Sequence, residues 1–288
     1  MKYRLAKGLL AAAAALTMTA VAVAPAQAAN LAPNRDRYAA VGDSFAYGVG
    51  TPKAASYPAV LAGKVNKVTL LAVSGADTEG VAAQVALIPP TAQQVTVTVG
   101  GNDGGAFTAL GVCLRDYQTA LSLAYPSLVD PSEIETCVFT APTPGEAAAQ
   151  TAGVTALLGM IQTRAPFATI YVTGYPLLFA ANTHPALNVR VCTIAGVGTL
   201  PGALFDGADF ATWALNGRIS TAVDNAQILG VNAQFVPVDF GPDQGLCDGT
   251  DSWIQGPADL APLHPTVDGL AAYADAIADA EFITGPTR

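Results

Sequence analysis

The sequence predicts an α/β protein built on a doubly wound, mainly parallel β-sheet. Several short runs are nearly continuous in Val, Ile, Leu and other apolar residues, without the alternation of a strand that has one exposed face. Parallel strands that are buried on both faces have this pattern. Longer helical stretches separate the runs, and strands that alternate with helices are typical of βαβ units in one parallel sheet.

Each expected strand ends in glycine or polar residues. In chain order, the expected strands are Arg37–Val41, Val68–Val73, Val95–Val99, Thr169–Thr173 and Gln234–Val238. The main helices are expected at Ser56–Lys64, Pro144–Thr163, Ala208–Leu229 and Thr266–Phe282. The last helix has a favourable start, because Thr266 can cap its amino end and Asp268 places negative charge in its first turn.

Two connections between these elements, Gly104–Thr143 and Leu177–Asp206, are several times longer than ordinary βα loops. Loops of this length are usually functional or contain short elements of their own. Each contains at least one of the four cysteines of the chain, so disulfide bonds are expected to hold them.

The four cysteines are Cys113, Cys137, Cys192 and Cys247, and no two of them form a CxxC pair. Four cysteines allow three pairings, and the sequence alone does not choose among them. Pairing of nearest neighbours, Cys113–Cys137 and Cys192–Cys247, closes loops worth about 3.5 and about 4 kcal/mol in the chain-entropy description. A metal site is not expected, because the chain has two histidines and lacks the close cysteine spacings of tetrahedral zinc sites.

The composition argues against several classes of protein. Of the 288 residues, 51% are hydrophobic and 12% are charged, and the formal net charge is −9. Intrinsic disorder needs low hydrophobicity and nucleic-acid binding needs a basic stripe, and the chain has neither property. The length suits one α/β domain with a large core, and no repeat or linker divides it.

Residues 1–28 have the pattern of a secretory signal peptide. Three basic residues precede the apolar run Leu9–Ala24, and the small-x-small pattern of Ala26-Gln27-Ala28 follows it. The run is short and rich in alanine for a membrane anchor, which needs about 20 strongly apolar residues. We therefore expect cleavage after Ala28, export from the cell, and a single domain over residues 29–288 without a stable membrane anchor.

Polar residues or glycines follow the first three predicted strands at the points where these strands end. Ser44 follows the first strand, Gly75 the second and Asn102 the third. The carboxyl ends of parallel strands meet at one edge of a doubly wound sheet, where ligands bind. A serine hydroxyl beside a backbone N–H and an amide donor is the set of groups that acyl transfer needs, because the donors stabilise the oxyanion.

The attack also needs a general base, and the chain has only two histidines, His184 and His264. His264 lies directly before the last predicted helix, in a loop that returns to the carboxyl edge of the sheet. His184 lies inside a long connection, where a packing or surface role is the better interpretation. We therefore expect Ser44 as nucleophile and His264 as base. The expected oxyanion donors are the N–H groups of Ser44 and Gly75 and the amide of Asn102.

The same residues resemble the motifs of the SGNH, or GDSL-type, serine esterases and lipases. Gly42-Asp43-Ser44-Phe45 is similar to the nucleophile motif of this family, and Gly75 to its oxyanion glycine. Gly100-Gly101-Asn102-Asp103 is similar to the GxND motif, and His264-Pro265 to the histidine motif. A single Gly-Asp-Ser is a weak signal, but these motifs occur together in the order of the family.

Further motifs are similar to those of the secreted actinobacterial members of the family. They are Ser56-Tyr57-Pro58, Gly174-Tyr175-Pro176 and the segment from Cys247 to Ser252-Trp253-Ile254. The resemblance implies a three-layer α/β/α sandwich with the flavodoxin-like arrangement of SGNH hydrolases. It also implies an ester hydrolase that needs no cofactor and no metal.

The histidine motif departs from the usual pattern of the family. Many members have an aspartate three residues before the catalytic histidine, and this chain has Ala261 there. Some secreted relatives use a backbone carbonyl of this segment instead. The resemblance therefore implies that the carbonyl of Ala261 orients His264, with the carboxylate of Asp259 as second choice. Asp43 is expected to organise the turn after the first strand, and Asp103 to hydrogen-bond nearby backbone.

The sequence thus predicts a secreted, monomeric serine ester hydrolase that acts through an acyl-enzyme. The expected substrate is a lipid or a short-to-medium-chain acyl ester, because Phe107–Leu114 and Leu177–Phe179 offer apolar side chains near the strand ends. Two alternatives stay open: a carbohydrate (acetyl) esterase, and a non-catalytic module that binds cell wall or carbohydrate. The aromatic content of 7% disfavours the second, because carbohydrate platforms usually stack sugars on aromatic rings.

Overall fold

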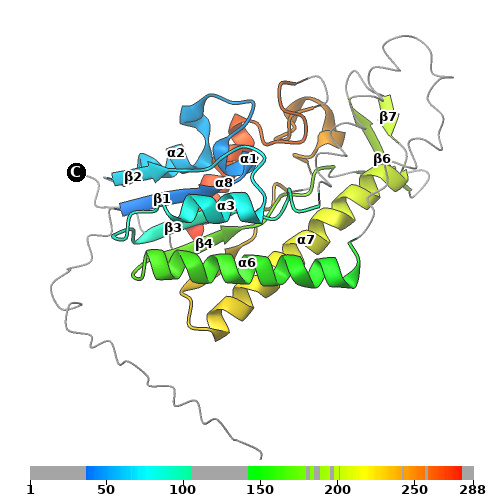
Figure 1. Cartoon of the computed structure of the whole chain (residues 1–288). Helices are drawn as coiled ribbons and strands as arrows, with labels where there is room; N and C mark the ends of the chain where they lie inside the picture. Colours follow the sequence, from blue (N-terminus) through cyan, green and yellow to red (C-terminus); the bar gives the residue numbers. More distant parts are fainter. Residues whose placement is uncertain are drawn as a thin grey trace, which may run out of the picture. The chain divides into compact units, whose positions relative to one another are not determined.

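A sheet of five strands forms the centre of the fold in the computed structural model of the chain (Figure 1). The strands are β1 (Arg37–Gly42), β2 (Lys67–Leu70), β3 (Gln94–Thr98), β4 (Thr169–Thr173) and β8 (Ala233–Val236). Their order is β2-β1-β3-β4-β8, and every neighbouring pair is parallel. This is the order of flavodoxin-like doubly wound sheets, so the predicted sheet is confirmed.

The structure describes residues 37–65, 67–104, 142–179, 182–184, 189–194, 198–200, 202–241, 243–256 and 259–280. Residues Asn34–Arg288 form one compact unit. The predicted signal peptide with its cleavage after Ala28 lies outside the described residues, as do Cys113 and Cys137. Within the described ranges, no helix is long and apolar enough to span a bilayer.

Helices cover both faces of the sheet and make three layers. One face carries α3 (Thr78–Val85), α6 (Pro144–Arg164) and α7 (Gly202–Ile228), and α6 packs against the other two. The other face carries α2 (Tyr57–Ala62) and α8 (Val267–Asp279), which pack against each other. Figure 1 shows α3 and α6 side by side in front of the sheet and α8 behind it. The α/β/α sandwich implied by the family resemblance is therefore present.

The central strands are buried on both faces, as their apolar sequence predicts. All five residues of β3 are buried, and in β1 only Arg37 is partly exposed. Two threonines of β3 fit this core because tyrosine hydroxyls satisfy their hydroxyl groups. The distance between hydroxyl oxygens is 2.7 Å for Tyr38 and Thr96, and 2.8 Å for Tyr57 and Thr98.

Some element boundaries differ from the predicted ones. β2 ends at Leu70 rather than at Val73, and α7 begins at Gly202 rather than at Ala208. Two helices, α1 (Ser44–Tyr47) and α3, are absent from the sequence-based prediction. They have four and eight residues, which is too short for an apolar face with helical period to stand out.

The Leu177–Asp206 connection contains a small antiparallel sheet of its own. Its strands are β5 (Asn182–His184), β6 (Val189–Ile194) and β7 (Gly198–Leu200), in the order β5-β6-β7. A disulfide joins Cys192 of β6 to Cys247 of the 3-10 helix η4 (Leu246–Asp251). It is one of the two nearest-neighbour pairs weighed from the sequence.

Candidate active site

The carboxyl ends of β1 and β3 meet at the point where the strand order reverses. β2 lies on one side of β1 and β3 on the other, so a ligand site is expected between the loops that follow β1 and β3. A pocket of about 190 Å³ lies there. Its lining includes Ser44, Gly75, Asn102 and His264. The structure therefore brings the site residues expected from the sequence to one place.

A tight turn after β1 presents Ser44 to the pocket. Gly42 ends the strand with a φ of 145°, and an added Cβ would lie 2.7 Å from the carbonyl oxygen of Thr98. Only glycine fits this position. Asp43 then caps α1 by accepting a hydrogen bond from the N–H of Phe45 at 2.9 Å. Ser44 is the first residue of this one-turn helix.

A buried glutamine of α3 holds the same turn. Gln84 Oε1 accepts a hydrogen bond from the N–H of Gly42 at 2.8 Å, and Gln84 Nε2 donates to the Gly42 carbonyl at 2.9 Å. These two bonds fix the end of β1 directly before Asp43 and Ser44. Gln84 could not be predicted from the sequence, because its role depends on the packing of α3 beside the end of β1.

The Ser44 hydroxyl and the His264 ring are in hydrogen-bond contact. The distance from Ser44 Oγ to His264 Nε2 is 2.8 Å, and His264 Nδ1 lies 3.0 Å from the carbonyl oxygen of Pro262. A carbonyl oxygen only accepts, so in the neutral ring Nδ1 carries the proton and Nε2 offers its lone pair to the Ser44 hydroxyl. The ring is thus in the tautomer that a general base needs.

The hydrogen bond of His264 Nδ1 goes to the carbonyl of Pro262, which is neither of the two groups weighed from the sequence. The carbonyl of Ala261 accepts the main-chain N–H of His264 at 3.2 Å, and the carboxylate of Asp259 accepts a main-chain N–H of its own loop at 2.7 Å. The cause is a turn with Pro262 in second place and Leu263, with a φ of 67°, in third. These are the features of a type II turn, whose central peptide is rotated. The rotation points the Pro262 carbonyl, rather than the Ala261 carbonyl, at the ring.

Gln255 fastens the histidine segment to the turn after Ser44. Its main-chain N–H donates to the His264 carbonyl at 2.7 Å. Its buried side-chain amide donates to the carbonyls of Val49 and Pro265, both at 2.9 Å. Val49 in turn donates its N–H to the carbonyl of Ser44 at 3.2 Å. A path of hydrogen bonds therefore joins Ser44 to Pro265, the residue next to His264.

Gly75 and Asn102 complete the lining with potential hydrogen-bond donors. Gly75 has a φ of 78°, and a Cβ there meets no atom within 4 Å, so the backbone conformation rather than crowding favours glycine. Asn102 Nδ2 donates to the carbonyl of Ala76 at 2.9 Å, which places the amide beside Gly75. A side-chain amide has two hydrogens, so the second can bind an oxygen in the pocket.

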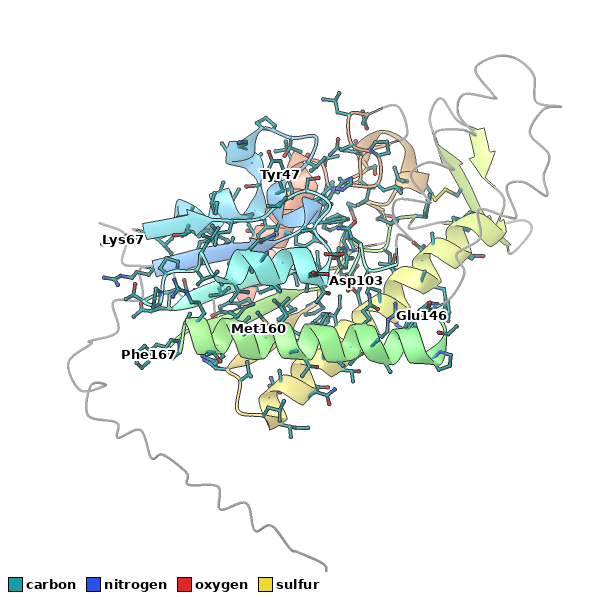
Figure 2. All side chains as sticks on the ribbon, viewed as in Figure 1. Tyr47, Lys67, Asp103, Glu146, Met160 and Phe167 are labelled. Atoms are coloured by element: carbon teal, nitrogen blue, oxygen red, sulfur yellow. A yellow bond between two sulfur atoms is a disulfide. The ribbon has the colours of Figure 1, made fainter. Side chains whose placement is uncertain are left out.

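Asp103, the last residue of the Gly-Gly-Asn-Asp motif, fixes this loop to α3. Its carboxylate accepts the N–H of Thr78 at 2.8 Å and the hydroxyl of Thr78 at 2.6 Å. Figure 2 shows Asp103 toward the site end of the sheet, whereas Lys67, the first residue of β2, lies at the opposite end. Asp103 thus has the backbone-binding role expected from the sequence.

Burial governs the ionisation of two groups that line the pocket. It raises the pKa of Asp43 from 3.8 to about 7, although hydrogen bonds from Tyr175 and from backbone N–H groups act in the opposite direction. Burial also lowers the pKa of His264 below its usual 6.5, and the carbonyls of Pro262 and Ala261 oppose this effect. His264 therefore stays neutral at lower pH than an exposed histidine does.

The second histidine, His184, lies in β5, where its partner across the small sheet is Val189. Its position in the chain is thus in the inserted sheet, and His264 is the histidine that contacts Ser44. Among the residues that the structure describes, no three His, Cys, Asp or Glu are grouped so that they could hold a metal ion.

Comparison with known proteins agrees with this geometry. The sequence profile of the GDSL-like Lipase/Acylhydrolase family matches residues 40–272. The chain belongs to this family. It is an ester hydrolase, and the non-catalytic binding module weighed from the sequence is set aside.

Two solved structures have the same fold as this GDSL hydrolase. The extracellular lipase from Streptomyces rimosus is 22% identical with a TM-score of 0.61, over 85% of this chain and 99% of that chain. The phospholipase A1 from Streptomyces albidoflavus is 20% identical with a TM-score of 0.61, over 85% of this chain and 98% of that chain. A comparison with curated protein sequences found no match.

Proposed function

We propose that this GDSL hydrolase is a secreted serine esterase that cleaves lipid or short-to-medium-chain acyl esters through an acyl-enzyme on Ser44. The 2.8 Å contact between Ser44 Oγ and His264 Nε2, in the pocket that Gly75 and Asn102 also line, is the observation that carries the proposal. A nucleophile, a base and oxyanion donors in one pocket are what acyl transfer needs.

Acylation begins when Ser44 Oγ attacks the carbonyl carbon of the ester. His264 Nε2 takes the hydroxyl proton, and the carbonyl oxygen becomes the oxyanion of a tetrahedral intermediate. The N–H groups of Ser44 and Gly75 and the amide of Asn102 stabilise this oxyanion. When the intermediate collapses, the bond to the alcohol oxygen breaks and His264 gives its proton to the leaving alcohol.

Deacylation follows the same path with water in place of the alcohol. His264 takes a proton from the water that attacks the acyl carbon, and returns it to Ser44 Oγ when the acid leaves. The Pro262 carbonyl accepts the Nδ1 hydrogen and holds the ring in orientation. It lacks the negative charge with which a carboxylate stabilises the imidazolium, so the machinery is a Ser–His dyad.

The proposed substrate class is supported by the names of two relatives. The two Streptomyces structures are named as an extracellular lipase and a phospholipase A1. The apolar segment Leu177–Phe179, expected to contact the substrate, does not line the pocket: Leu177 is 44% exposed, and Leu178 and Phe179 are fully buried in the core. Phe107–Leu114, the other apolar segment expected near the site, lies outside the described residues. Export is supported by the signal-like pattern of residues 1–28 and by the disulfide, since disulfides persist mainly in oxidising compartments.

We predict that Ser44→Ala and His264→Ala each lower the hydrolysis of p-nitrophenyl butyrate by about 10⁴-fold or more, because nucleophile and base act as one unit. A fluorophosphonate should label the wild-type protein and leave Ser44→Ala unlabelled. The matched controls are Ser220→Ala on α7 and His184→Ala, which should keep wild-type rates. Full hydrolysis by either site variant would sink the assignment.

The substrate class is tested with a chain-length series of p-nitrophenyl esters from acetyl to palmitoyl, beside phosphatidylcholine and acetylated xylan. The proposal expects the highest kcat/KM on butyrate-to-decanoate esters or on the phospholipid. A clear preference for acetylated xylan would replace it by the carbohydrate esterase alternative, without changing the roles of Ser44 and His264.

A further inference from the structure

Tyr175 is the central residue of the Gly174-Tyr175-Pro176 motif, and the proposed chemistry gives it no part. It follows β4, is 1% exposed and lines the same pocket as Ser44. Its ring packs edge-on against the ring of Phe45, with centroids 4.9 Å apart. A buried phenol at the wall of an active-site pocket needs hydrogen-bond partners, and those partners indicate what it does.

The Tyr175 hydroxyl bridges the two loops that form the site. It donates to Asp43 Oδ2 at 2.5 Å and accepts the main-chain N–H of Gly101 at 2.9 Å. Asp43 belongs to the turn after β1 and Gly101 to the loop after β3. One oxygen atom therefore joins two segments that are 58 residues apart in the sequence.

Each of these two loops carries a proposed oxyanion donor directly beside the bridged residue. Ser44 follows Asp43, and Asn102 follows Gly101. The other Asp43 oxygen, Oδ1, accepts the N–H of Phe45 at 2.9 Å, so the carboxylate is fixed to the main chain of the nucleophile turn. The spacing between the Ser44 N–H and the Asn102 amide is thus coupled to the position of the Tyr175 oxygen.

The main chain of Tyr175 is fixed as firmly as its hydroxyl. Asn216 of α7 accepts the N–H of Tyr175 at 2.8 Å and donates to its carbonyl at 2.7 Å. A Cβ on the preceding Gly174 would lie 3.0 Å from Asn216 Oδ1, so the glycine allows this close approach. Hydrogen bonds to α7 therefore hold the main chain of Tyr175, and its hydroxyl lies between the two loops.

We propose, on the basis of the serine esterase function above, that Tyr175 is a positioning residue that sets the spacing of the oxyanion donors Ser44 and Asn102. It does not exchange protons with the substrate. Burial raises the pKa of its phenol well above 10, so the hydroxyl stays protonated and keeps donating to Asp43. The same hydrogen bond lowers the pKa of Asp43 against the effect of burial, which favours the ionised carboxylate that holds the phenol.

The test is Tyr175→Phe, which removes one oxygen atom and keeps the ring beside Phe45. We expect kcat to fall between about 10- and 100-fold with KM within about twofold, because a small displacement of a preorganised group affects the transition state more than substrate binding. Tyr38→Phe is the matched control. Like Tyr175, Tyr38 is a buried tyrosine with a hydrogen-bonded hydroxyl. Its partner is the Thr96 hydroxyl at 2.7 Å, and Tyr38 does not line the pocket around Ser44. The Tyr38→Phe variant should lose similar thermal stability and keep the wild-type kcat.

Two further readouts separate positioning from general loosening of the fold. A boronic acid forms a tetrahedral adduct with the nucleophilic serine, so its affinity for Tyr175→Phe should fall by the same factor as kcat/KM. Asn102→Ala alone should cost about 10²- to 10³-fold in rate, as loss of one oxyanion donor does. In that background, Tyr175→Phe should cost less than about threefold more, because the spacing between the Ser44 N–H and the Asn102 amide no longer affects the rate once that amide is removed.

Wild-type kcat and boronate affinity in Tyr175→Phe, or full additivity with Asn102→Ala, would overturn the role of Tyr175 and leave the serine esterase intact. Activity in Ser44→Ala would instead refute the esterase mechanism itself. If Tyr175→Phe does not fold, Asn216→Ala carries the same test, because it releases the main chain of Tyr175 and leaves the hydroxyl in place. An unchanged kcat and boronate affinity in Asn216→Ala would then overturn the proposal.

Discussion

The His264 ring lies between the Ser44 hydroxyl and the Pro262 carbonyl, and these are the hydrogen-bond partners of its two nitrogens among the described residues. A carbonyl dipole stabilises an imidazolium less than the full charge of a carboxylate does. Burial removes water from the charged ring and favours the neutral imidazole, and the carbonyl hydrogen bond opposes this effect less than a carboxylate would. The neutral imidazole is the form that accepts the proton of Ser44 in the proposed mechanism.

We predict that kcat/KM falls on the acid side with a midpoint below pH 6.5, the usual pKa of histidine. Only neutral His264 can accept a proton, so the rate falls as the pH falls through the pKa of this residue. Because burial lowers that pKa, the enzyme keeps its activity to lower pH than an exposed histidine would allow. The pH dependence of kcat/KM on a soluble ester measures the midpoint.

Burial raises the pKa of Asp43 to about 7, so its effect on the rate must be separated from that of His264. NMR of the histidine rings in Ser44→Ala gives the pKa of His264 directly, with His184 as the internal reference. A kinetic midpoint at or above pH 6.5 that coincides with the His264 titration would contradict the prediction. If the acid-side fall in kcat/KM disappears in Asp43→Asn, that fall is due to the ionisation of Asp43 instead.

At the scale of elements, the loop around His264 pairs antiparallel with the segment Trp253–Gln255. Ile254 and Pro265 form a bridge, and the N–H of Thr266 donates to the carbonyl of Trp253 at 2.8 Å. Gln255 adds its side chain to this pairing and reaches across to Val49. The distance between His264 and Ser44 is therefore set by backbone pairing together with one buried amide.

We predict that Gln255→Met lowers kcat about tenfold and lowers Tm by several degrees. Methionine has a similar length but no donor, so the carbonyls of Val49 and Pro265 lose the hydrogen bonds that Gln255 gives them. His264 then has a less fixed distance to Ser44, and small displacements of a base are costly in rate. Steady-state kinetics and thermal unfolding of the same preparation measure the two effects.

Gln162→Met is the matched control for this element. Gln162 lies near the end of α6, donates to the carbonyl of Pro166 at 3.1 Å and accepts the N–H of Asn232 at 2.7 Å. These contacts lie at the amino end of the sheet, away from the pocket. Gln162→Met should therefore lower Tm and leave kcat unchanged. Equal kcat values in the two variants would show that Gln255 only stabilises the fold.

At the scale of the whole molecule, the sheet and the main site residues could be predicted from sequence because they depend on local patterns. Central strands such as β3 are buried on both faces, so they are apolar throughout, and their carboxyl ends must share one edge. That edge gathers Ser44, Gly75 and Asn102, and the scarcity of histidines selects His264. No contact had to be known for these steps.

The supporting contacts could not be predicted because they join distant parts of the chain. Gln84 and Gly42 are 42 residues apart, Tyr175 and Asp43 are 132 apart, and Gln255 and Val49 are 206 apart. The choice of the Pro262 carbonyl depends on the positive φ of Leu263, and a leucine gives no sign of that conformation. Only tertiary packing imposes it.

The Cys192–Cys247 disulfide connects the inserted sheet to the segment that leads to the histidine loop. Its cysteines are 55 residues apart, and closing such a loop is worth about 4 kcal/mol in the chain-entropy description. We predict that the double variant Cys192→Ala with Cys247→Ala loses up to about that much unfolding free energy, with a Tm lower by on the order of 10 °C. Alanine is chosen because Cys192 is fully buried, where a serine hydroxyl would need a partner.

Neither cysteine lines the pocket, so kcat measured well below the transition should stay near the wild-type value. Urea unfolding with and without reductant measures the loss, and an unchanged midpoint would contradict it. A large loss of kcat in the folded variant would show that the disulfide also fixes the histidine loop, because η4 leads directly into the segment that pairs with it.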